Sequence, residues 1–153
     1  MGSVMNKILV VEDDPSIMEM LKYCLESQGY MIISAENGKT ALNWVKEGNI
    51  DLAIIDLGLP DMNGMEVCRT IKDNPRTRAT PVIILTGNSS NEARIESRLV
   101  ANANLFLNKP IDAGDLRKAV SKMFEKSERE KRLLRTSIKF RLDGRLSQPG
   151  KQP

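Results

Sequence analysis

Short apolar runs alternate along the chain with longer segments in which apolar residues recur at helical spacing. Each run has four or five residues, and most are rich in β-branched side chains, a composition typical of buried parallel strands. The predicted strands are Lys7–Val11, Tyr30–Ser34, Leu52–Ile55, Pro81–Leu85 and Asn104–Leu107. Capping residues and turn residues separate these runs and mark where the intervening helices begin.

The strict alternation of strand and helix predicts an α/β fold. Helices are expected to begin near Asp14, Asn37, Gly64, Glu92 and Asp112. Such alternation implies a doubly wound five-stranded parallel sheet with helices on both faces and right-handed crossovers. For five units the common strand order is 2-1-3-4-5, the flavodoxin-like (βα)5 arrangement, and the strands with the fully apolar runs Ile8–Val11 and Val82–Leu85 should be central.

Length and charge divide the chain into a body and a tail. The 153 residues are enough for one packed domain and an appendage, and we place the domain at residues 6–125. Residues 1–125 carry 14 Lys/Arg and 17 Asp/Glu, whereas residues 126–153 carry 9 and 3. An acidic body argues against nucleic-acid binding by the domain itself. Residues 126–153 are expected to form a basic helical extension or linker with a disordered tail, and residues 1–5 a vector-derived remnant or a short extension.

Composition also excludes several kinds of chemistry. The chain has no histidine, which removes His-based acid–base catalysis, His metal ligation and a phosphohistidine carrier. Cys24 and Cys68 are too few for a disulfide or metal framework, so we expect both to be core residues. No apolar run approaches the ~20 residues of a membrane span, and the start lacks a signal sequence. We therefore expect a cytoplasmic protein with no membrane partner.

Polar residues follow the predicted strands at the edge where parallel sheets place their ligands. Glu12 and Asp13 follow the first strand, Asp56 the third, Thr86 the fourth and Lys109 the fifth. Three carboxylates at one edge repel each other unless a cation joins them, and hard oxygen ligands suit Mg²⁺ or Mn²⁺. Together with a lysine and a hydroxyl, they suggest phosphoryl transfer with an Asp nucleophile.

Each of these residues, taken alone, has an ordinary structural explanation. Asp56 could be a turn residue, Thr86 a helix cap and Lys109 a solvated surface lysine. The functional hypothesis gains weight because all of them are expected at one edge of one sheet.

The sequence resembles the receiver domain of two-component response regulators, whose fold is that of the chemotaxis regulator. The resemblance covers about residues 6–125 and rests on four segments: I-L-V-V-E-D-D-P, D-L-A-I-I-D-L-G-L-P-D-M-N-G, V-I-I-L-T and F-L-N-K-P. It implies that Asp56 is the phosphoacceptor. It also implies that Asp13 binds Mg²⁺ directly, that Glu12 binds it directly or through water, and that Gly58 offers its backbone carbonyl.

The resemblance extends to residues that would respond to phosphorylation. Thr86 would bond the phosphoryl group, Lys109 would pair with it, and Phe106 would be the switch aromatic. A cis bond before Pro110 would direct the lysine inward.

Two positions differ from the common family pattern. Family members often have Asp at the position of Glu12 and Ala at that of Gly87, and neither difference removes chemistry. Gly58, Gly87 and Asn88 are placed to control access of water to the phosphorylated residue.

The expected function is therefore a signalling switch and not an ordinary enzyme. A sensor histidine kinase or phosphotransfer protein would phosphorylate Asp56. The face formed by the fourth helix, fifth strand and fifth helix would then bind an output protein or domain, or a second copy of the chain. The receiver could stand alone or belong to a larger regulator, because 28 residues after Glu125 are too few for an output domain. The alternative is an Asp-nucleophile phosphatase, which is disfavoured because Gly58 supplies no general acid.

Overall fold

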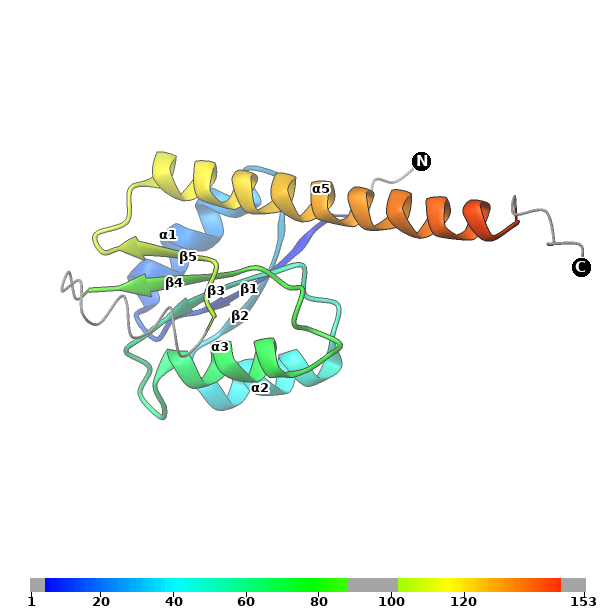
Figure 1. The fold of residues 1–153 in the computed structure, drawn as a ribbon. Coiled ribbons are helices and arrows are strands. Elements are labelled where there is room, and N and C mark those ends of the chain that lie inside the picture. Colours follow the sequence, from blue (N-terminus) through cyan, green and yellow to red (C-terminus); the bar gives the residue numbers. More distant parts are fainter. Residues whose placement is uncertain (1–4, 88–101, 147–153) are drawn as a thin grey trace, which may run out of the picture.

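A computed structural model describes residues 5–87 and 102–146, with side chains to residue 144. The protein is a parallel sheet between two layers of helices (Figure 1). The elements are β1 (Lys7–Val11), α1 (Pro15–Glu26), β2 (Met31–Ala35), α2 (Gly38–Glu47), β3 (Leu52–Asp56), α3 (Gly64–Asp73), β4 (Val82–Thr86), β5 (Leu105–Asn108) and α5 (Ala113–Leu146). All neighbouring strands are parallel and the order is β2-β1-β3-β4-β5, which confirms the predicted fold. The helix predicted near Glu92 lies outside the described residues.

Alternating side chains of the sheet supply two hydrophobic cores. In β1, Leu9 and Val11 pack in the core beneath α2 and α3, while Ile8 and Val10 pack in the core beneath α1 and α5. This follows from the two-residue period of a strand, which directs successive side chains to opposite faces. All five residues of β3 and of β4 are buried, so the core holds the residues at the ends of these two strands in place.

The strand ends differ slightly from the prediction. β2, β3, β4 and β5 each end one residue later than expected, at Ala35, Asp56, Thr86 and Asn108. The ladder between β4 and β5 extends to the Thr86–Asn108 pair, and the Lys109 backbone N–H donates to the Thr86 carbonyl at 2.9 Å. The polar residues of the candidate site are therefore partly fixed by the sheet itself.

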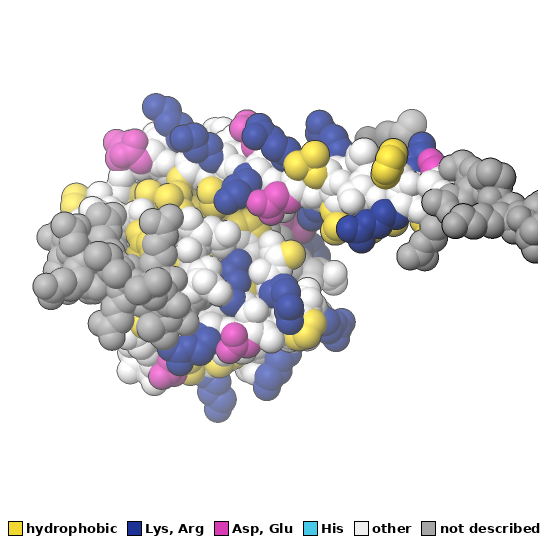
Figure 2. All heavy atoms as spheres, viewed as in Figure 1, with side chains coloured by type: hydrophobic (Ala, Val, Ile, Leu, Met, Phe, Trp, Pro, Cys, Tyr) yellow, Lys and Arg dark blue, Asp and Glu magenta, His cyan; other side chains and the backbone are white. Residues whose placement is uncertain are grey.

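Helix α5 continues far beyond the sheet as a single helix of 34 residues (Figure 1). Asp112 caps its start by accepting from the Asp115 backbone N–H at 2.9 Å. Every described side chain from residue 128 to residue 144 is exposed. Figure 2 shows Lys and Arg side chains beside hydrophobic ones along this part of the helix. None of the described helices is long and apolar enough to cross a membrane.

Ion pairing on this extension does not follow the spacing that a helix most often uses. The pairs Glu125–Arg129 and Glu128–Arg132 have the spacing of four residues that allows an ion pair on a helix. The ion pair observed on the described extension instead joins Lys131 Nζ to Glu128 Oε1 at 3.6 Å. Both of its side chains are exposed, so it contributes little to stability.

Candidate functional site

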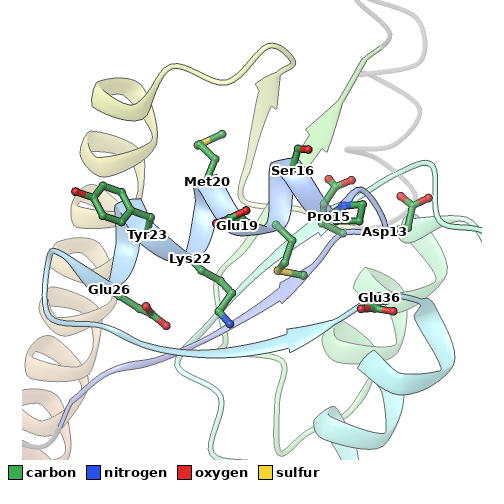
Figure 3. Close-up of a pocket in the computed structure, with 11 residues that line it drawn as sticks. Asp13, Pro15, Ser16, Glu19, Met20, Lys22, Tyr23, Glu26 and Glu36 are labelled. Atoms are coloured by element: carbon green, nitrogen blue, oxygen red, sulfur yellow. The ribbon is translucent and has the colours of Figure 1, made fainter.

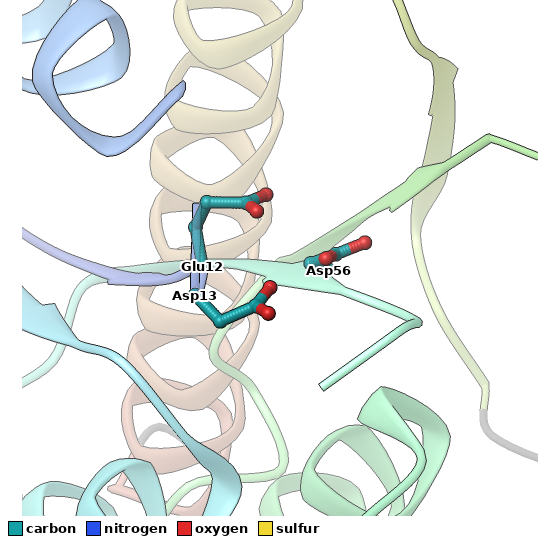
Figure 4. Close-up of side chains that lie close together, drawn as sticks. All are labelled: Glu12, Asp13 and Asp56. Carbon is teal, nitrogen blue, oxygen red and sulfur yellow. The ribbon is translucent and has the colours of Figure 1, made fainter. Parts of the chain in front are cut away.

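Three carboxylates converge at the carboxyl ends of β1 and β3 (Figure 4). Glu12 and Asp13 follow β1, Asp56 ends β3, and one oxygen from each lies within 4.8 Å of the others. The adjacency of β1 and β3 in the sheet brings these residues together, as the sequence predicted.

Glu12 is held in the protein interior by the backbone around it. Only 1% of the surface of Glu12 is exposed. Its backbone N–H donates to the Ala35 carbonyl at 3.0 Å, and its Oε1 accepts from the Asp14 N–H at 3.2 Å. The next residue, Asp13, is exposed, so the pair offers one buried and one accessible carboxylate.

Asp56 is buried, with 6% of its surface exposed. Its Oδ1 accepts from the Gly58 backbone N–H at 3.3 Å. Gly64 packs against the Asp56 backbone carbonyl, and a Cβ at Gly64 would collide with that carbonyl oxygen. Glycine at position 64 therefore allows α3 to begin close to the end of β3.

Lys109 reaches both buried carboxylates from β5. Its Nζ lies 3.0 Å from Glu12 Oε2 and 3.3 Å from Asp56 Oδ2. The Lys109–Pro110 peptide bond is cis, as the resemblance implied. Thr86 ends β4 beside these groups and is 3% exposed. The five polar residues that the sequence singled out thus come from four strand ends at one edge of the sheet.

Burial and charge act in opposite directions on the titration of this cluster. Burial raises the pKa of the Glu12 carboxyl, although contacts with Lys109 and Asp14 oppose the rise. Burial alone would lower the pKa of Lys109, but its contacts with Glu12 and Asp56 outweigh burial and raise it. Lys109 therefore stays protonated at neutral pH and supplies one positive charge to three carboxylates.

The arrangement fits a divalent cation. Three carboxylates and one lysine leave an excess of negative charge, and carboxylate oxygens are the ligands that Mg²⁺ and Mn²⁺ prefer. Glu12, Asp13 and Asp56 could hold such an ion. The exposed Gly58 lies two residues beyond Asp56, where its backbone carbonyl could join them.

Two further predicted residues, Phe106 and Gly87, belong to the strands that end at this edge or follow them directly. Phe106 is half-buried on β5 and packs against the core beneath α2 and α3. Gly87 is exposed immediately after β4, and Asn88 lies outside the described residues.

A groove of about 740 Å³ extends from the carboxylates along α1 (Figure 3). Glu12 and Asp13 line it at the site, and Met18, Met20 and Tyr23 are among the α1 residues that line the rest. The sequence did not predict this groove, because the α1 pattern identified only the side that faces the core.

A second feature missed from sequence concerns Asp61 in the β3–α3 loop. Its carboxylate accepts from the backbone N–H groups of Gly38 and Lys39 at 2.8 and 2.9 Å. An Asp after a proline suggested only a local turn. Nothing in the sequence indicated partners more than 20 residues away.

Comparisons with known proteins agree with this geometry. The family profile of the response regulator receiver domain matches residues 8–121. The transcriptional regulatory protein ResD of Bacillus subtilis is 41% identical over 90 residues, which is 59% of this chain and 36% of ResD. The chain thus spans about a third of the length of that relative.

Solved structures show the same fold. A CheY-like receiver domain protein from Methanospirillum hungatei is similar with a TM-score of 0.77 and 28% identity, covering 83% of this chain and 99% of that one. The receiver domain of sensor histidine kinase PA1611 from Pseudomonas aeruginosa, with magnesium coordinated in its active site cleft, has a TM-score of 0.72 and 28% identity. This match covers 78% of our chain and 98% of the PA1611 receiver.

Fold, acidic edge and family profile together define a signalling domain and not a classical enzyme. The chain belongs to the response regulator receiver domain family of two-component systems.

Proposed function

We propose that this chain receives a phosphoryl group on Asp56 from the phosphohistidine of a sensor histidine kinase or phosphotransfer protein. An Asp56 carboxylate oxygen forms the new P–O bond while the P–N bond to the partner's imidazole breaks. Water later attacks the phosphorus, which breaks its bond to Asp56, releases inorganic phosphate and restores the carboxylate. The observation that carries the proposal is the position of Lys109 Nζ, 3.0 Å from Glu12 and 3.3 Å from Asp56 within the carboxylate cluster.

The residues around Asp56 have separate tasks. Glu12, Asp13, Asp56 and the Gly58 carbonyl would hold Mg²⁺ or Mn²⁺, which when bound neutralises charge on the phosphoryl oxygens. Lys109 supplies a second positive charge to those oxygens.

Release of the phosphoryl group needs water at the same site. Gly58 and Gly87 leave room for it, because neither has a side chain and both are exposed. Asn88, outside the described residues, is expected to affect the lifetime of the phosphorylated form.

Phosphorylation then changes the face that includes β5 and α5. It adds about −1.5 to −2 charges and three acceptor oxygens. Thr86 and Lys109 move toward these oxygens, and Phe106 turns into the space behind Thr86. This local change shifts the equilibrium between two arrangements of the face that includes β5 and α5, as charge changes do in protein switches generally.

The changed face binds an output protein or domain, or a second copy of the chain, in the cytoplasm. The receiver comprises residues 6–125, and residues 126–153 are its extension or linker. The groove along α1 supports the proposal because it gives a phosphodonor protein a surface that leads directly to the carboxylates.

Substitution of the phosphoacceptor tests the proposal. With acetyl phosphate and Mg²⁺, intact-protein mass spectrometry should show one added phosphoryl group on the wild type and none on Asp56→Asn. Asp51→Asn is the matched control, because Asp51 is an exposed carboxylate at the opposite end of β3. It should be labelled like the wild type. Labelling of Asp56→Asn at another residue would contradict the assignment.

A further inference from the structure

The loop between β3 and α3 is fastened to the fold at both ends and at its tip. At its ends, Gly58 forms an antiparallel bridge with Asn63, and the Gly64 N–H donates to the Leu57 carbonyl at 3.0 Å. At its tip, Asp61 Oδ1 accepts from the Gly38 N–H at 2.8 Å and Oδ2 from the Lys39 N–H at 2.9 Å. The loop that contains Gly58 is therefore tied to the start of α2.

Apolar packing supports the same contact. Met62, next to Asp61, lies over Gly38, and a Cβ at position 38 would collide with the Met62 side chain. Met62 is half-buried and packs against the core beneath α2 and α3. The tip of the loop thus meets α2 through a carboxylate on one side and a thioether on the other.

Helix α2 already has a cap from its own sequence. Asn37 accepts from the Thr40 N–H at 2.8 Å, which is the usual local N-cap bond. Asp61 satisfies the two amides before Thr40 from a loop that lies more than 20 residues away. These amides lower the pKa of the Asp61 carboxyl, so it is ionised at neutral pH and favoured by the helix dipole.

We propose that Asp61 is a positioning residue that holds the β3–α3 loop on α2 so that the Gly58 carbonyl stays in place to bind the metal ion. This inference rests on the proposed function, because Gly58 acts as a ligand only if the site binds Mg²⁺. Residues that orient metal ligands commonly change metal affinity about 10–100-fold when removed. Asp61 acts through a loop and so should have a smaller effect.

The test compares Asp61→Ala and Asp61→Asn with Asp51→Ala. Asp51 is the matched control because it is also an exposed carboxylate that accepts a backbone N–H, from Lys7 at 2.8 Å, but at the other end of β3. By isothermal titration calorimetry with Mg²⁺, Asp61→Ala should raise the Kd about three- to tenfold. Asp61→Asn should give a smaller rise, because its amide retains one acceptor oxygen. Asp51→Ala should bind as the wild type does.

Two further readouts separate positioning from a general loss of structure. At saturating Mg²⁺, the rate of labelling by acetyl phosphate in Asp61→Ala should return to within about twofold of the wild type, because the reacting groups are intact. In the metal-free protein, hydrogen exchange at the Gly38 and Lys39 amides should be faster in Asp61→Ala and unchanged in Asp51→Ala.

The outcomes distinguish this inference from the proposed function. If the wild type binds no Mg²⁺, the proposed function fails. If the wild type binds Mg²⁺ and Asp61→Ala binds it equally well, the positioning role is overturned while the proposed function stands. An equal loss of affinity in Asp51→Ala would also overturn it, because the effect would then be general destabilisation.

Discussion

The carboxylates of Glu12, Asp13 and Asp56 lie close enough to repel one another in the metal-free protein. Glu12 is almost fully buried, and burial raises the pKa of its carboxyl. Asp13 adds a third carboxylate within 4.8 Å of Glu12 and Asp56, with Lys109 as the cation observed beside the buried pair. Functional sites commonly lower the stability of a protein in this way, and removing one of the like charges should recover part of that stability.

We predict that Asp13→Asn raises the thermal stability of the metal-free protein by about 3 °C, because it removes like-charge repulsion at a partly solvated site. In the wild type, Mg²⁺ at a hundred times its Kd should stabilise the fold by about 2.7 kcal/mol, and Asp13→Asn should lose most of this gain. Thermal melts with and without Mg²⁺ measure both effects.

Asp14→Asn provides the control for this measurement. Asp14 Oδ1 accepts from the Ser16 and Ile17 N–H groups at 2.8 and 3.2 Å, and Asn can keep that cap. Its response to Mg²⁺ should equal that of the wild type. An unchanged Mg²⁺ shift in Asp13→Asn would exclude Asp13 as a ligand.

At the scale of elements, the junction between β3 and α3 depends on a residue without a side chain. A Cβ at Gly64 would collide with the Asp56 backbone carbonyl, so Gly64→Ala must move the strand end or the helix. We expect a loss of about 2–3 kcal/mol in the free energy of unfolding, measured by urea denaturation, together with slower labelling of Asp56.

Gly144→Ala is the matched control for this substitution. Gly144 lies in the exposed part of α5, where a Cβ would meet nothing within 4 Å. Alanine there should leave the free energy of unfolding unchanged or slightly higher, since glycine is less favourable than alanine in a helix. If both variants unfolded at the wild-type urea concentration, the close approach at Gly64 would not matter for stability.

The sequence predicted the elements well because local chemistry determines them. The apolar run Leu52–Ile55 and the Asp14 cap are decided within a few residues, and strand order follows from alternation. The ends of β2, β3, β4 and β5 were each placed one residue short. For β3, β4 and β5 the reason is that a polar residue such as Thr86 does not reveal that the sheet ladder continues through it.

Contacts between distant segments could be predicted only where the strand topology alone determines them. The strand ends predicted that Glu12, Asp56 and Lys109 would meet, since topology alone brings those ends together. The bond from Asp61 to α2 depends on how a loop folds back across the molecule, and no spacing indicates that. The assignment of Gly58, Thr86 and Phe106 to their functions stays a prediction.

At the scale of the whole molecule, an acidic body carries a basic helical arm. Residues 126–146 include eight Lys/Arg and three Asp/Glu, and every described side chain from 128 to 144 is exposed. The carboxylate cluster lies at the strand ends, within elements that all belong to the body. Removal of the helical arm should therefore leave the candidate site intact.

We predict that a chain of residues 1–125 is labelled on Asp56 in a Mg²⁺-dependent reaction at within about twofold of the full-length rate, since no proposed site residue is removed. Size-exclusion chromatography with light scattering, with and without beryllofluoride as a phosphoryl mimic, adds a second readout. A doubled mass in both chains assigns the β5–α5 face to a second copy. A constant mass in both assigns that face to a different partner, and failure of residues 1–125 to be labelled would contradict the proposed domain boundary.

The unbroken course of α5 has a mechanical consequence. The same helix packs on the sheet through Leu116 and Val120 and then runs free to Leu146. At ~1.5 Å per residue, residues 126–146 form a lever about 30 Å long with its pivot on the receiver. A tilt of about 5° at the pivot sweeps the far end through roughly 3 Å. A rearrangement too small to alter the sheet would thus be amplified into a larger displacement of a molecule attached near Leu146.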